Sequence, residues 1–293
     1  MARTIRNPVE WAAQYVTGSA HYVEETVERL GGAGHGPAAE PELRRIEIAD
    51  LRGIVEKGVA DFAACRSDVM FLVLIYPVVG LLVTWLAFHG DLLPLVFPAA
   101  SGFALIGPLA GVGLYEMSRR LEKGETVSWA AALGVIRSPS FGAIVVLGLL
   151  LIAIFFAWLR VALGIYDATL GPEIPVSVGR FAMDVLTTQT GWAMIILGLA
   201  VGFAFACAVL AISVVSFPLL LDRDVGLPEA VLTSVRVTLL NARPMGAWGL
   251  IVAVALLIGS IPLFLGLIVV LPVLGHATWH LYRATVVPER RGE

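Results

Sequence analysis

Long apolar stretches are the feature that most constrains how this chain can fold. Four of them, 69–88, 94–116, 141–160 and 192–221, carry no ionised side chain in their middle. A helix needs roughly 20 mostly apolar residues to cross a bilayer. Lipid offers no hydrogen-bond partners, and a helix satisfies its backbone N–H and C=O groups internally. These stretches therefore predict four transmembrane helices.

A fifth stretch, 246–275, has no charged residue and is too long for one upright helix. The sequence Gly-Ser-Ile-Pro at 259–262 interrupts it near its centre and predicts a tight turn. We therefore expect two shorter helices, at about 244–260 and 262–281. The interpretation that we favour is that both cross the membrane fully, and the alternative is a re-entrant hairpin.

The distribution of basic residues supports six spans and gives them an orientation. Six spans place 18 of the 20 Lys and Arg residues on one side of the membrane. Loops rich in these residues stay cytoplasmic, so both termini are predicted at the cytoplasmic face of a bacterial inner membrane. Replacing the last two spans by one would move Arg283, Arg290 and Arg291 to the other side and weaken the asymmetry.

The chain divides into three parts. Residues 1–45 read as a cytoplasmic amphipathic helix followed by a flexible linker rich in Gly, Ala and Pro. Residues 46–285 form the membrane domain, and 286–293 form a cytoplasmic tail. Amphipathic cytoplasmic helices are also expected before spans 1, 3 and 5. This pattern resembles three repeats, although any basic loop before a span tends toward it.

Composition excludes several classes of function. A net charge of −3 without clustered Lys and Arg gives no basis for binding nucleic acid. Two cysteines, Cys65 and Cys207, provide neither a disulfide framework nor a zinc motif. The first 69 residues lack the apolar core and cleavage site of a secretory signal peptide. No catalytic constellation is found, so we expect no enzyme activity and no cofactor.

Small residues on spans 2 and 4 are candidates for close helix packing. Gly107 and Gly111 lie four residues apart on span 2, and Gly198 and Gly202 do so on span 4. Small residues at this spacing let two membrane helices approach closely, so these spans are predicted to be the central packing pair. Span 2 is also rich in Pro and predicts a bent helix, which alternatively could line a substrate path.

Charged residues gather where spans 2 and 4 leave the membrane on the predicted cytoplasmic side. We interpret them as anchors near anionic headgroups or as contacts for a partner subunit. These residues are Glu116, Arg119, Arg120, Asp222 and Arg223.

Two histidines, His276 and His280, lie one helical turn apart at the inner end of span 6. A pair at this spacing can bind a metal from one helix face, but no third ligand lies nearby in the sequence. Histidine and aromatic residues are also ordinary at a headgroup boundary, so we predict no metal site and keep the pair as weak candidates.

Three segments carry a family resemblance: residues 58–62, 97–108 and 113–122. The last contains Tyr-Glu-Met-Ser-Arg-Arg at the exit of span 2. They resemble an uncharacterised bacterial family of predicted integral membrane proteins, domain of unknown function 2189. The resemblance extends over roughly 45–285 and implies a multi-pass membrane protein, without implying any activity or site residue.

These observations favour a non-enzymatic scaffold, assembly or accessory subunit of another membrane complex. Its expected partners are the lipid bilayer and a membrane protein complex contacted through the N-terminal cytoplasmic helix. The alternative is a permease for a small neutral or amphiphilic solute, motivated by the bent span 2.

Overall fold

The structure is a computed structural model that describes residues 41–73, 81, 85, 93–125, 127–128, 132–173, 175 and 177–288. Within these residues it contains helices and no β-strand, which confirms the all-α prediction. The predicted N-terminal helix, most of span 1 and the end of the C-terminal tail lie outside the described residues.

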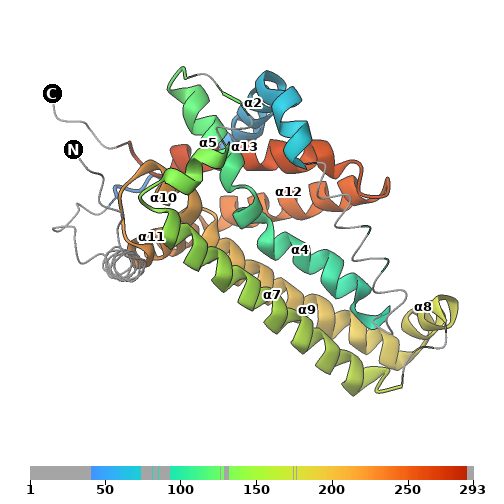
Figure 1. The fold of residues 1–293 in the computed structure, drawn as a ribbon. Helices are drawn as coiled ribbons and strands as arrows, with labels where there is room; N and C mark the ends of the chain where they lie inside the picture. Colours follow the sequence, from blue (N-terminus) through green and yellow to red (C-terminus); the bar gives the residue numbers. More distant parts are fainter. Residues whose placement is uncertain are drawn as a thin grey trace, which may run out of the picture.

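Figure 1 shows the helices of the described residues. Their bounds are α2 Asp50–Val73, η1 Leu93–Leu95, α4 Val96–Ala110, α5 Val112–Glu122, η2 Leu133–Arg137, α7 Phe141–Thr169, α8 Val178–Thr187, α9 Gln189–Ser213, α10 Ser216–Asp222, α11 Leu227–Leu240, α12 Ala242–Ser260 and α13 Leu267–Thr285.

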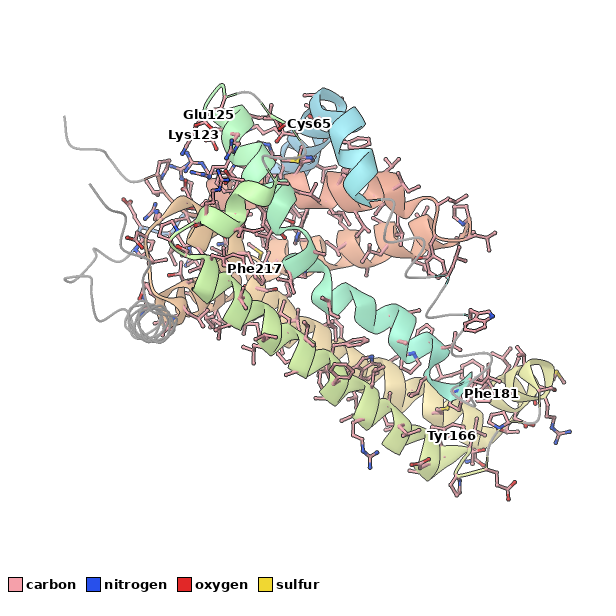
Figure 2. The ribbon with its side chains drawn as sticks, in the orientation of Figure 1. Cys65, Lys123, Glu125, Tyr166, Phe181 and Phe217 are labelled. Carbon is pink, nitrogen blue, oxygen red and sulfur yellow. The ribbon has the colours of Figure 1, made fainter. Side chains whose placement is uncertain are left out.

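Two groups of helices make up the bundle. In the first, α7 lies between α4 and α9 and packs along both. In the second, α13 packs along α2 over much of its length and also contacts α5 and α12. The groups meet at one end through α5, α10 and α11, as Figure 1 shows. Lys123 and Glu125 lie at this end, and Tyr166 and Phe181 lie at the opposite end beside α8 (Figure 2).

Four apolar helical segments are long enough to cross a membrane: 93–122, 141–169, 189–222 and 242–260. The first joins α4 and α5 across a break at Gly111, and Pro108 lies just before it. Proline has no N–H to donate within a helix, so the predicted bend in span 2 has an identifiable cause. The third joins α9 and α10, which separate at Val214 and Val215.

Helix boundaries differ from the predicted ones in three places. Helix α2 joins the amphipathic helix expected before span 1 to the first residues of that span without a break. Before span 3 the described residues include the short 3-10 helix η2, while 129–131 lie outside them, and α11 forms the predicted helix before span 5. Helix α7 continues past 160 because Ala162 and Tyr166 prolong its buried face.

The last apolar stretch forms two helices joined by a tight turn, as predicted. Helix α12 ends at Ser260 and α13 begins at Leu267. The two arms touch next to the turn, where a Cβ added at Gly266 would lie 2.7 Å from the Gly259 backbone. Glycine at both positions is what allows this approach.

The predicted pairing of spans 2 and 4 needs a correction. A Cβ added at Gly107 or Gly198 would meet no heavy atom within 4 Å in the described structure. Gly202 instead faces the Trp158 ring of α7, 3.1 Å from its added Cβ, and Gly111 lies under Tyr115 of its own helix. The same Trp158 ring lies beside Gly102 of α4, so a large side chain of α7 packs against a glycine of both helices.

Close packing by small residues occurs in the other group. A Cβ added at Gly58 of α2 would lie 2.6 Å from Ala277 Cβ and 2.7 Å from the Ala277 nitrogen on α13. Gly275 has the same role against Leu114 of α5, at 2.5 Å. Two glycines thus bring α2, α13 and α5 together, which positions the polar side chains described next.

Candidate functional site

Polar side chains from four parts of the chain meet at the end of the bundle where the two helix groups join. We call this cluster the polar end. Its members are Asp61 of α2, Ser118 and Glu122 of α5, Asp222 of α10, and His276, Trp279, His280, Tyr282 and Arg283 of α13.

The two histidines of the polar end bind different partners. Asp61 Oδ2 accepts a hydrogen bond from Ser118 Oγ at 2.6 Å and lies 2.9 Å from His280 Nε2. His276 Nδ1 lies 2.8 Å from the same Ser118 Oγ. Ser118 and His276 are fully buried. The four side chains therefore tie α2, α5 and α13 together through one hydrogen-bonded chain.

The carboxyl group of Asp61 is kept ionised by these contacts. Burial alone would raise its pKa, but the hydrogen bonds with His280 and Ser118, aided by the nearby imidazoles, outweigh that effect. The net result is a pKa below the ordinary value of 3.8. An ionised Asp61 can accept from both neighbours at neutral pH, so the cluster is complete under ordinary conditions.

Asp, Ser and His are also the residue types of hydrolytic enzymes, but their order here differs. In a catalytic triad the histidine lies between the other two and takes the serine proton. Here the serine lies between, and its hydroxyl donates to the carboxylate of Asp61. With no exposed surface on Ser118, a substrate has no access to its oxygen. The arrangement is that of a structural connection between helices.

Arg283 forms the second half of the polar end. Its guanidinium lies 2.8 Å from Glu122 Oε1 and 3.3 Å from Asp222 Oδ2. Asp222 also accepts from the Tyr282 hydroxyl at 2.7 Å, and Glu122 accepts from the Trp279 indole at 3.0 Å. One turn of α13 therefore binds the last residues of both α5 and α10.

Glu116, Arg119 and Arg120 form a separate group on α5. The Glu116 carboxylate is buried and lies 2.7 Å from Arg119 Nε and 2.8 Å from Arg120 Nε. A buried carboxylate needs such partners, and two guanidinium groups satisfy both of its oxygens. Both ion pairs lie within α5, so the two arginines neutralise the Glu116 carboxylate of their own helix.

Arg223 binds the end of the chain. Its guanidinium donates to the carbonyl oxygen of Val287, and the segment after α13 pairs with the segment before α2. Arg44 N donates to Thr285 O at 2.8 Å, and Asn241 Nδ2 donates to Arg44 O at 3.2 Å. Residues 41–46 and 286–288 are thereby held at the polar end.

The predicted site residues divide between the polar end and its surroundings. Asp222, His276 and His280 lie within it, whereas Glu116, Arg119, Arg120 and Arg223 pair next to it. Sequence reasoning did not identify Asp61, Ser118, Glu122 or Arg283 as site residues. The spacing of His276, Trp279, His280 and Arg283 was a usable signal, because it predicts one polar face along the last turns of α13.

The described residues contain no group of three His, Cys, Asp or Glu side chains placed to hold a metal ion. Nδ1 of His276 is engaged by Ser118, and its buried Nε2 has no hydrogen-bond partner among the described atoms. His280 directs Nε2 at Asp61. The two rings therefore do not share a common ligand position.

Comparison with known proteins bears on the middle of the chain. Residues 96–222 match the family described as Predicted integral membrane protein (DUF2189). The match confirms the resemblance over this part, which runs from the first residue of α4 to the last residue of α10. No match was found among curated proteins or among solved structures.

With its long apolar helices and this match, the protein is an integral membrane protein. The segment that matches this family contains Ser118, Glu122 and Asp222 of the polar end. Asp61 and the residues of α13 lie outside the matched segment.

Proposed function

We propose that this protein is a non-enzymatic scaffold or accessory subunit that binds another membrane complex through the outer face of α9. The observation that carries the proposal is a row of small residues on the side of α9 that faces away from α7. Gly202 contacts Trp158 of α7, and the opposite side exposes Ala200, Ala204, Cys207 and Ala208.

Lipid alone accounts for exposed apolar side chains, but small ones at a spacing of four have a further use. They let a second helix backbone approach closely, and membrane helices associate by such packing. Larger side chains, Ile196 and Phe203, border the row and are also exposed. The row therefore forms a shallow face of the kind that receives a helix.

The polar end also supports the proposal, because its groups are occupied by contacts with one another. Its carboxylates, hydroxyls and guanidinium bind one another, and its serine is buried. Such a cluster stabilises a helix arrangement and offers little for chemistry on a substrate. We therefore assign partner binding to the outer face of α9, together with the predicted N-terminal helix, which lies outside the described residues.

The proposed location is a bacterial inner membrane with the polar end and both termini in the cytoplasm. The excess of Lys and Arg in the segments that meet at this end supports it. A cysteine at Glu125, which is exposed there, should react with a membrane-impermeant maleimide only in inside-out vesicles. Reaction in right-side-out vesicles would reverse the proposed orientation.

The scaffold proposal is tested by enlarging one residue of the row. Ala204→Leu should abolish co-purification of the partner from mild detergent at native expression, while the variant stays folded. Ala157→Leu, an equally small change on an exposed position of α7, is the matched control and should retain the partner. Loss with both variants or with neither would contradict the proposal.

The second candidate, a permease for a small neutral solute, is favoured by the helix break at Gly111. Broken helices in transporters surround substrate sites at the middle of the membrane. Purified protein in liposomes would then accelerate swelling in glycerol over protein-free liposomes. Equal swelling rates would leave this candidate without support.

A further inference from the structure

The hairpin of α12 and α13 can be compared in length with the other membrane helices, because Arg283 gives them a common origin. This residue of α13 contacts Glu122 at the end of α5 and Asp222 at the end of α10. Three helical paths thus leave one level of the bundle and run into the membrane. Their lengths decide how far each one reaches.

The path along α13 is much shorter than the other two. At about 1.5 Å per residue, α13 extends about 24 Å from Arg283 back to Leu267, where the turn begins. The path from Glu122 through α5 and α4 to Leu93 is about 43 Å, and the path from Asp222 to Gln189 is about 50 Å. The hairpin therefore ends roughly 20 Å before the far ends of its neighbours.

Tilt reinforces this difference. In Figure 1 the hairpin diverges from α7 and α9, and its turn lies away from α8. A helix that is inclined to its neighbours reaches less far along their direction than its own length. The breaks at Gly111 and at Val214 shorten the reach of the other two paths, but α9 alone, at about 36 Å, is still longer than α13.

The chemistry of the turn is that of a segment in hydrocarbon. Residues 261–266 contain no charged or hydrogen-bonding side chain. Ile261, Leu263 and Leu265 expose 75%, 70% and 57% of their surface. Turns at a water boundary normally use Gly, Asn, Asp or Ser, yet Leu263 and Phe264 occupy positions with positive φ here. These are side chains that lipid favours and water does not.

Backbone hydrogen bonding fits the same environment. The N–H groups of Leu263, Phe264 and Leu265 donate to Ile261, Ser260 and Pro262 carbonyl oxygens, at 2.9, 3.1 and 3.0 Å. Leu267 and Ile268 continue the series. An unsatisfied backbone donor in hydrocarbon costs several kcal/mol, so a turn in lipid needs internal bonds of this kind.

The position of the hydrocarbon core follows from the charges on α5. Glu116, Arg119 and Arg120 mark the boundary, and a core of about 30 Å extends from there over about 20 residues, to the start of α4. His276 lies at the same level, because it contacts Ser118. From His276 to Leu267 is about 13 Å of helix, less than half of the core.

We infer that α12 and α13 form a re-entrant hairpin whose apolar turn, residues 261–266, is embedded among lipid acyl chains near the middle of the bilayer. The protein then enters and leaves the membrane at the same face through this pair. A re-entrant hairpin and a pair of full spans both return the C-terminus to the side of the polar end. The two topologies are therefore equally compatible with the charge distribution.

Single cysteines test the depth of the turn. In a Cys65→Ala/Cys207→Ala background, L263C protein in oriented vesicles should resist a membrane-impermeant maleimide from both faces. Thr187→Cys on α8 should react from one face and Glu125→Cys from the other, since both positions are exposed at opposite ends. L263C should react fully after denaturation in SDS, which confirms an available thiol.

A spin label at the same cysteine identifies what surrounds the turn. Acyl chains predict high accessibility to oxygen and low accessibility to a nickel chelate, with Leu265→Cys giving the same result. Maleimide reaction from the face that labels Thr187→Cys would mean that the pair crosses fully and would overturn the inference. Low accessibility to both probes would mean that protein covers the turn, which would overturn it as well.

Discussion

The polar end and the outer face of α9 use opposite means to organise the same bundle. At the polar end, charged and hydroxyl groups from distant parts of the chain bind one another, and most of them are buried or half-buried. On α9, apolar and small side chains face outward, and the rest of the described structure leaves them exposed. The difference suggests that the first region fixes the fold and that the second is available for binding.

The largest expected effect is at Asp61, which accepts hydrogen bonds in the helix cluster. Asp61→Ala leaves the buried Ser118 hydroxyl and His280 without their acceptor, and should lower the free energy of unfolding by about 3 kcal/mol. Unfolding by SDS in mixed micelles measures it. Glu56→Ala on the same helix removes an exposed acid that pairs with Arg52, and should change it by less than about 1 kcal/mol.

A smaller effect tests the approach of α2 to α13. Gly58→Ala places a Cβ against the Ala277 backbone and should cost about 2 kcal/mol by the same measurement. Gly53→Ala is the control on α2, because a Cβ added there meets no atom within 4 Å in the described structure. It should be neutral or stabilising by up to about 1 kcal/mol, since Ala favours helix over Gly. An equal loss of stability in the two variants would contradict the assignment of the loss to the contact between Gly58 and Ala277.

Acid should weaken the polar end selectively. The pKa of Asp61 is lower in the folded protein than its ordinary value of 3.8, so its contribution is present above that pH. The contribution is lost as the pH falls through the lower, folded pKa. Stability of the wild type should therefore decline below about pH 4, and Asp61→Asn should remove this part of the decline. An unchanged acid profile in that variant would contradict the assignment.

The smallest effect is expected at the ion pairs of Arg283. This side chain is about a quarter exposed, so solvent screens its contacts with Glu122 and Asp222. Arg283→Gln should lower the free energy of unfolding by about 1 kcal/mol, again in mixed micelles. Arg180→Gln on α8, whose pair with Asp184 is more exposed, should lower it less.

Much of the fold could be predicted from the sequence because the apolar stretches specify membrane helices directly. The bend in span 2 and the turn at Gly259 followed from Pro and Gly in the same way. Which helices are neighbours did not follow. Gly107 and Gly198 suggested one pairing, but helix packing depends on large partners such as Trp158, which a small-residue pattern does not reveal.

The polar end could be predicted only in part. His276 and His280 stood out because they lie one helical turn apart at the end of a span. Asp61 did not stand out because it is one of several charged residues on a helix that mixes charged and apolar side chains, and its contact with α13 depends on the close approach at Gly58. A contact between residues 61 and 280 depends on tertiary packing, which no local pattern contains.

The central claim is that the small-residue face of α9 binds a partner while the polar end serves the fold. Site-specific photo-crosslinking in cells tests it most directly, with a photoreactive residue at Ala204 and, as a control, at the exposed Leu149 of α7. The claim predicts one discrete protein adduct from position 204 that Ala200→Leu in the same chain removes, and none from 149. Adducts with lipid alone at both positions would contradict it.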